Sequence, residues 1–234
     1  MNLPAVSEKL ALEMAKNGVL HSHKKSKTHP KMKPFIGAIR NEIEILKPEI
    51  VLATVTRAAD FIKSIIVKKG LILIVGTQPS AHAAVRKLSD TFNFPYVTTR
   101  WLGGTITNFS VMKQRLAHYQ NLKTKKEKGE LSKYTKKEQS IFGKELNKMK
   151  IKFDGLVRLD RVPDAVLVID PKQHDTAVKE GIKAKIPVLA VLDTNDNPEK
   201  INFPIMANDH SKSSVDWLVE KILEIVHTEQ VEEK

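Results

Sequence analysis

The chain has 234 residues, of which 41% are hydrophobic, and a formal net charge of +12. This length predicts one sizeable core with an insertion rather than two full domains, and the positive charge indicates a polyanionic partner rather than a small neutral substrate. No apolar run approaches the roughly 18 residues of a membrane span, no apolar signal core is found near the N-terminus, and the absence of cysteine excludes disulfides and thiolate metal sites, so we expect a soluble cytoplasmic protein.

The first distinctive segment is the stretch HSHKKSKTHPKMKPFI at 21–36. Pro30 and Pro34 prevent a regular helix, so we expect an extended polycationic arm that lies against a phosphate backbone, with His29 able to stack on an unpaired base. A solvated loop is the alternative interpretation. The lysines of the segment are Lys24, Lys25, Lys27, Lys31 and Lys33.

A strand–helix–strand unit follows the arm. A helix is predicted over 55–70, and the runs at 71–77 and 95–99 predict buried strands on either side of a helix over 79–92. The turn GTQPSA (76–81) lies where an open α/β sheet binds nucleotide phosphate, but neither GxGxxG nor GxxxxGK[ST] is present. We therefore expect an ordinary turn and no dinucleotide cofactor.

The stretch RWLGGTITN joins this unit to the next segment. Gly103 and Gly104 permit positive φ and a close approach of the backbone, and Thr105 or Thr107 can cap the helix that follows. We expect a hinge whose exposed backbone amides bind a phosphate oxygen, with a bidentate contact from Arg100. Such a hinge would hold a nucleic-acid backbone without catalytic chemistry.

An insertion of different character spans 105–152. Its apolar residues recur at steps of three and four and predict two antiparallel helices joined by a turn at Gly129. Lysines crowd the remaining faces, which favours contact with phosphate over a solvated coiled coil. Trp101 and Leu102, just before the insertion, either plug its base or stack on bases.

A second unit of the same kind completes the predicted fold. The runs DAVLVID (164–170) and VLAVLDTN (188–195) predict buried strands with a helix through 177–182 between them, and 213–227 predicts an amphipathic helix on the sheet. Strands that alternate with helices indicate an α/β layered fold with a mainly parallel sheet.

Catalytic and metal motifs are sparse. Asp193, Asp196 and Asp209 offer hard oxygen ligands for Mg²⁺ at the sheet edge, although no ligand spacing supports them. His21 and His23 lack the HExxH motif or cysteine pair typical of zinc sites. Since there is no GxSxG elbow and no nucleophile with an identifiable base, we expect no catalytic residue and no bound metal.

Blocks of the sequence, in this order, resemble the bacterial-type small-subunit ribosomal protein S2 (uS2) family: HPKMKPFI (29–36), IVGTQ (74–78), RWLGGTITN (100–108), YTKKE (134–138), VPDAVLVID (162–170), GIKAKIPVLAVLDTN (181–195) and NPEKINFPIMAND (197–209). The resemblance implies a Rossmann-like or flavodoxin-like fold with an inserted α-helical coiled-coil hairpin. It implies a non-catalytic, structural constituent of the small ribosomal subunit, bound to 16S-type rRNA near the mRNA exit platform and to neighbouring ribosomal proteins, including S1 where present.

We therefore expect an α/β rRNA-binding core over 1–104 and 153–234, with the basic arm in 1–36, and a basic coiled-coil hairpin over 105–152. We expect a ribosome-bound protein of the cytoplasm rather than of an organelle, without cofactor, membrane or small-molecule substrate. A nucleotide-dependent α/β enzyme, by fold analogy alone, and a basic protein on an anionic membrane are the alternatives. The candidate rRNA-binding residues are Lys24, Lys25, Lys27, His29, Lys31, Lys33, Arg100, Trp101, Gly103, Gly104, Thr107, Asn108, Lys113 and Arg115.

Overall fold

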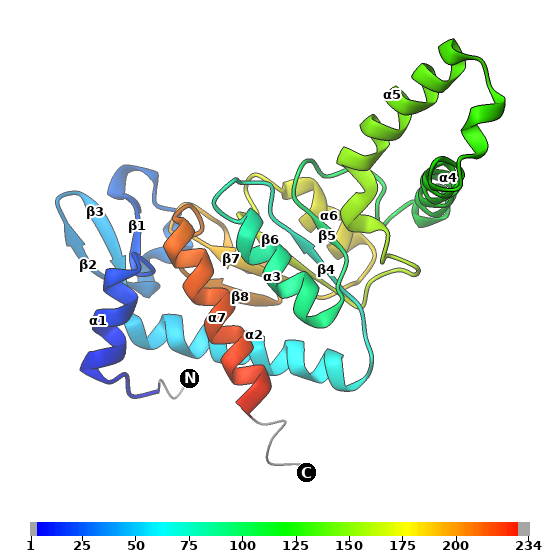
Figure 1. Ribbon diagram of the computed structural model, residues 1–234. Helices are drawn as coiled ribbons and strands as arrows, with labels where there is room; N and C mark the ends of the chain where they lie inside the picture. The colour runs from blue at the N-terminus through cyan, green and yellow to red at the C-terminus, as the bar shows by residue number, and fades with distance from the viewer. Residues whose placement is uncertain (1–3, 229–234) are drawn as a thin grey trace.

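A five-stranded parallel sheet in the order β5-β4-β6-β7-β8 forms the centre of the computed structural model, which describes residues 4–228 (Figure 1). Every residue of β4, β6 and β7 is buried, because helices cover both faces of the sheet. Four of the strands confirm the predicted runs, whereas β8 follows β7 without an intervening α-helix and was not predicted. The strands are β4 (Ile72–Val75), β5 (Tyr96–Val97), β6 (Ala165–Ile169), β7 (Val188–Leu192) and β8 (Phe203–Met206).

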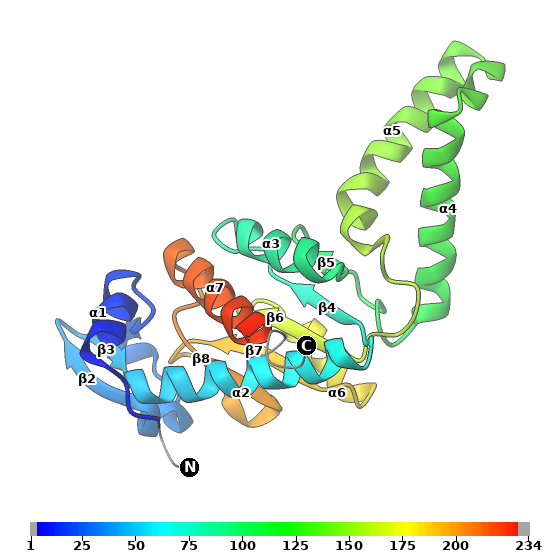
Figure 2. The ribbon, with the colours of Figure 1, turned by 60° about the horizontal axis from the view of Figure 1, so that its bottom comes forward.

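Four helices cover this sheet: α2 (Pro48–Val67), α3 (His82–Phe92), α6 (Asp175–Lys183) and α7 (Lys212–Thr228). Helices α3, α7 and α2 lie side by side, and α6 packs against β6 and β7 (Figures 1 and 2). The crossovers through α3 and α6 run in opposite directions along the sheet, so right-handed crossovers place these helices on opposite faces. The strand order therefore reverses between β4 and β6, which is where open α/β sheets form a crevice at their carboxyl ends.

A second, antiparallel sheet of three strands, in the order β1-β3-β2, lies beside the core. Helix α1 (Glu8–Lys16) precedes it, and short 3-10 helices connect its first two strands. This sheet and α1 were not predicted, since their segments are short, with four or five residues in each strand and nine in α1. The strands are β1 (His21–Lys24), β2 (Ile36–Arg40) and β3 (Ile43–Leu46), and the 3-10 helices are η1 (Lys25–Lys27) and η2 (Pro30–Phe35).

The prediction of an extended arm over 21–36 is wrong, because the segment folds as a strand followed by 3-10 turns. Pro30 stands at the first position of η2, where a missing N–H costs nothing. Met32 is fully buried and anchors the turn in the core. The His29 N–H donates to the Thr194 carbonyl at 2.8 Å, so the arm is hydrogen-bonded to the loop after β7.

Between β5 and β6 the chain forms a helical hairpin, composed of α4 (Phe109–Glu127), η3 (Glu130–Lys133) and α5 (Lys136–Phe153). It projects from the body at the end remote from β1–β3 (Figure 2). Gly129, with φ of +70°, makes the turn after α4, and Thr135 with Glu138 forms a capping box at the start of α5. The remaining 3-10 helices are η4 (Asp154–Leu156) and η5 (Pro198–Lys200). Within residues 4–228, no helix has the length and apolar character needed to cross a membrane.

Candidate nucleic-acid interface

The arm, residues 21–36, presents its lysines on the surface. Lys24, Lys25, Lys27 and Lys33 are exposed, and His29 is half-buried. Lys31 is also exposed but forms an ion pair with Glu199, so part of its charge is already compensated. Because the 3-10 turns fix the backbone, these cations form a surface of defined shape rather than a mobile tail.

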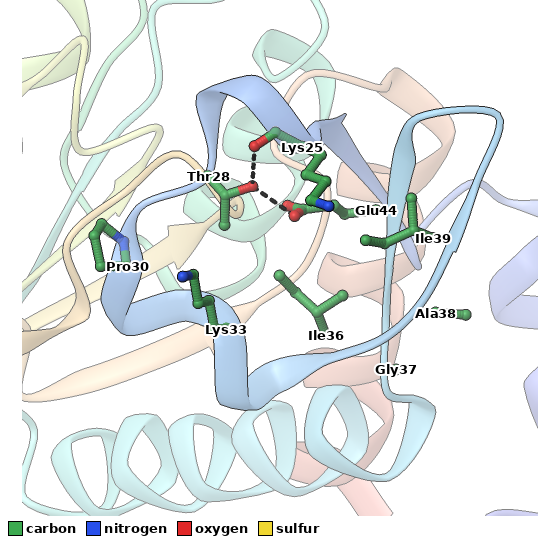
Figure 3. Close-up of a pocket in the computed structure, with 9 residues that line it drawn as sticks. All are labelled: Lys25, Thr28, Pro30, Lys33, Ile36, Gly37, Ala38, Ile39 and Glu44. Atoms are coloured by element: carbon green, nitrogen blue, oxygen red, sulfur yellow. Dashed lines mark hydrogen bonds between the residues drawn. The ribbon is translucent and has the colours of Figure 1, made fainter.

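A pocket of about 700 Å³ opens between the arm and the strands β2 and β3 (Figure 3). Lys25 and Lys33 line it together with apolar side chains such as Ile36 and Ile39. Glu44, which is 2% exposed, accepts a hydrogen bond from the Thr28 hydroxyl at 2.5 Å through Oε1. The pocket thus combines cations with an apolar wall, which suits the phosphate and sugar faces of a nucleic-acid strand.

The glycine turn, residues 100–108, closes around one carboxylate. Glu180 of α6 accepts hydrogen bonds through Oε1 from the Trp101 indole N–H at 2.9 Å and the Gly104 N–H at 2.8 Å. Its Oε2 accepts from the N–H groups of Ile106 and Thr107 at 3.0 and 3.2 Å. Burial opposes ionisation of Glu180, but the hydrogen bonds from Trp101 and from backbone N–H groups prevail and lower its pKa below the usual value.

The prediction that these backbone amides are exposed for phosphate is therefore wrong for Gly104 and Thr107, because both already donate hydrogen bonds to Glu180. Trp101 is 9% exposed, and its ring plugs the base of the turn instead of presenting a face to a base. Gly104 adopts the positive φ expected of it, at +84°. No sequence motif marked Glu180, since its partners lie more than 70 residues away in the chain.

The outer side of the glycine turn remains accessible. Arg100, Gly103 and Asn108 are exposed, as is the Thr107 side chain. Arg100 and Gly103 line a polar pocket of about 450 Å³ at the carboxyl end of the sheet. Within residues 4–228, no hydrogen-bond or ion-pair partner occupies the Arg100 guanidinium.

The hairpin holds most of the net positive charge of the protein. Residues 105–152 contain thirteen Lys and Arg and four Glu, a net charge of +9 out of the total of +12. Lys113 and Arg115 are exposed on the first turns of α4. Further along, Lys123, Lys126 and Lys150 line a groove between α4 and α5. The two basic surfaces, arm and hairpin, lie at opposite ends of the molecule (Figure 1).

Four aspartates gather where β6, β7 and β8 end: Asp170, Asp193, Asp196 and Asp209. Burial is the main cause that raises the pKa of Asp193 to about 7, of Asp196 to about 6 and of Asp209 to about 9.

The structure does not assemble the oxygen set expected for Mg²⁺. Asp193 accepts a hydrogen bond from the Thr194 N–H at 2.5 Å, and Asp196 accepts one from the Asp193 N–H at 3.0 Å. Both carboxylates therefore bind backbone N–H groups of the turn in which they lie. Asp209 instead lies with Asp170 and His210. Sequence analysis missed Asp170, because a residue after a strand acquires neighbours only when the strands are aligned in a sheet.

Comparison with known proteins identifies relatives over most of the chain. The family model described as ribosomal protein S2 matches residues 14–228. A protein of Rhodomonas salina named small ribosomal subunit protein uS2c is 36% identical over 214 residues, covering 92% of this chain and 88% of its own. Proteins named small ribosomal subunit protein uS2 are similar too: that of Buchnera aphidicola is 37% identical, covering 87% and 83%, and that of Acidothermus cellulolyticus is 36% identical, covering 92% and 78%.

Proposed function

The chain belongs to the ribosomal protein S2 family, and we propose that it binds small-subunit rRNA through two separate basic surfaces, the arm and the hairpin with its base. Membership makes the protein a structural constituent of the small ribosomal subunit, assembled there with rRNA and other ribosomal proteins, and not an enzyme.

The distribution of charge is the observation that carries the proposal. The hairpin concentrates a net charge of +9 on two projecting helices, and such a density of one sign repels itself unless a polyanion neutralises it. Phosphates of a folded rRNA supply that neutralisation, and each Lys–phosphate contact releases counterions.

Each surface contributes in a different manner. The arm offers exposed lysines on a fixed backbone, together with the mixed pocket in Figure 3. At the hairpin base, Arg100, Lys113 and Arg115 lie on accessible faces, where the planar guanidinium groups can bind phosphate bidentately. Gly103 lines the same pocket as Arg100. Asn108 and the Thr107 side chain are exposed in the same turn, although the Thr107 hydroxyl donates to Glu180 Oε2 at 3.2 Å. Trp101 supports it from inside.

We also propose a position and a compartment from the family likeness. The protein lies near the mRNA exit platform and contacts S1 where that protein exists. The ribosome is that of a bacterial cytoplasm. We expect a tagged copy to sediment with cytoplasmic small subunits and to crosslink there to mRNA and S1. Recovery in an organelle fraction would contradict the proposed compartment but not the proposed position.

Two triple variants test the rRNA interface. Lys24/Lys25/Lys33→Gln removes arm charges, and Lys123/Lys126/Lys150→Gln removes charges from the hairpin groove. Each variant should lower the slope of log affinity against log salt for small-subunit rRNA by roughly 2 to 3, since each contact contributes about 0.7–0.9.

The matched control, Lys87/Lys212/Lys221→Gln, removes three lysines that form ion pairs with Glu220, Asp216 and Glu224. It should leave the slope unchanged. If the control weakens binding as much as the other two variants do, binding depends on net charge alone, and the proposed interface is wrong.

A further inference from the structure

Four residues, contributed by β1 and by the loops after β6 and β8, meet at the carboxyl edge of the sheet, beside the switch point between β4 and β6. Asp170 follows β6, Asp209 and His210 follow β8, and His23 belongs to β1 of the arm. A carboxylate oxygen of Asp170, one of Asp209 and a ring nitrogen of His210 all lie within 4.8 Å of one another. A tetrahedral zinc site needs ligand atoms about 3.4 Å apart, so small side-chain rotations suffice.

Asp209 is the unusual member of this group. It is 1% exposed, and neither of its carboxylate oxygens has a hydrogen-bond partner among residues 4–228. Nδ1 of His210 lies 3.3 Å from Oδ1 of Asp209. A buried polar group without hydrogen bonds is costly, so both Asp209 oxygens are open to a ligand in the folded chain.

The histidines point to the nature of that ligand. The Nε2 atoms of His23 and His210 lie 3.1 Å apart, so two imidazole rings face the site, and an unprotonated imidazole nitrogen can bind a metal ion. Mg²⁺ takes oxygen ligands in an octahedron, whereas imidazole with carboxylate is a donor set of zinc.

We propose that Asp170, Asp209 and His210 bind one Zn²⁺ ion, with His23 as the fourth ligand. The Gln78 amide nitrogen occupies the space between two of these ligands, 2.5 Å from Asp170 Oδ2 and 3.1 Å from His210 Nδ1. This side chain lies in the turn after β4 and swings aside when the ion enters.

The ion has a path and a structural role. A cavity of about 550 Å³, lined by His23, Asp170 and His210 among others, connects the site with solvent. Bound Zn²⁺ joins the first strand of the arm to the ends of β6 and β8. It thereby holds the arm against the core.

Metal binding by the full chain tests the proposal. Protein stripped with a chelator is dialysed against zinc chloride or magnesium chloride, and bound metal is measured by atomic emission. The wild type should hold about one zinc ion per chain and little magnesium. Asp209→Asn should lower zinc affinity at least about tenfold, whereas Asp216→Asn, a carboxylate paired with Lys212 on α7, should bind as the wild type does.

Folding is checked independently. Asp209→Asn replaces a carboxylate lacking hydrogen bonds by an amide of the same shape, so the metal-free variant should melt at or above the metal-free wild type. Only the wild type should gain thermal stability and slower proteolysis of residues 21–36 on adding zinc. If the asparagine variant does not fold, His210→Ala, at a more exposed position, gives the same readouts. A wild type that binds no zinc or only magnesium, or a folded variant that retains full affinity, overturns the proposal.

Discussion

The Glu180 carboxylate accepts a hydrogen bond from the Trp101 indole N–H at 2.9 Å, between residues 79 positions apart. This contact, with the N–H groups of Gly104, Ile106 and Thr107 on the same carboxylate, ties the base of the hairpin to α6. A turn that resembles a phosphate cradle therefore already encloses an anion of its own protein. The RNA contact proposed for this turn would use its outer side, where Arg100 is exposed.

Replacing Glu180 by Gln should destabilise the fold by about 3 kcal/mol. The amide brings an NH₂ group against N–H donors and removes the charge that strengthens their hydrogen bonds. Urea unfolding measures this loss. The control Glu220→Gln removes an exposed partner of Lys87 and should cost no more than about 0.5 kcal/mol; equal losses in the two variants would contradict the anchoring role of Glu180.

The same carboxylate should make stability depend on acid. Because the folded-state pKa of Glu180 is lowered from its ordinary 4.5, its contribution is fully present above about pH 4.5 and is lost as the pH falls through the folded value. The difference in unfolding free energy between wild type and Glu180→Gln should therefore shrink below that pH. Chemical unfolding of both proteins across an acid series measures this difference. A difference in unfolding free energy that grows in acid would contradict a lowered pKa of Glu180.

Two glycine-to-alanine changes should shift the stability of the protein in opposite directions. A Cβ at Gly155 would collide with the Tyr96 carbonyl oxygen and approach its ring to 2.9 Å, so Gly155→Ala should cost about 1–3 kcal/mol. Gly143 lies within α5 with no heavy atom near its added Cβ, and Gly143→Ala should stabilise by about 0.5–1 kcal/mol. Thermal melting of both variants is the measurement; similar shifts in one direction would refute the close approach of η4 to β5.

Tyr119 should titrate later than an ordinary tyrosine. It is 1% exposed, and its hydroxyl donates to Asp154 Oδ1 at 3.0 Å. Burial, aided by this hydrogen bond, raises its pKa to about 12. Its stabilising effect is thus present below about pH 10 and lost as the pH rises towards 12.

Tyrosinate absorbance should show one late transition that Tyr119→Phe abolishes. The exposed Tyr134 provides the matched control, since Tyr134→Phe should leave the late transition in place. Loss of the hydroxyl should also cost about 1 kcal/mol of stability, because Asp154 loses its partner at the base of the hairpin.

Local sequence patterns were sufficient to predict the central strands and the hairpin helices. Unbroken apolar stretches within 71–77, 164–170 and 188–195 predicted the central strands, because a strand buried on both faces leaves no polar alternation. Helical periodicity likewise predicted the helices now seen as α4 and α5. The division into core and insertion, and the rRNA contacts of the basic residues, stay predictions.

The partners of each buried polar group depend on the tertiary structure and could not be read from local sequence patterns. Glu180 and the glycine turn, the folded arm with buried Met32, and the group of Asp170, Asp209 and His210 all depend on contacts between segments far apart in the chain. Periodicity and local motifs report what a residue does to its own helix, strand or turn. They carry no information about which donor a buried carboxylate meets, because strand order and helix packing set that distance.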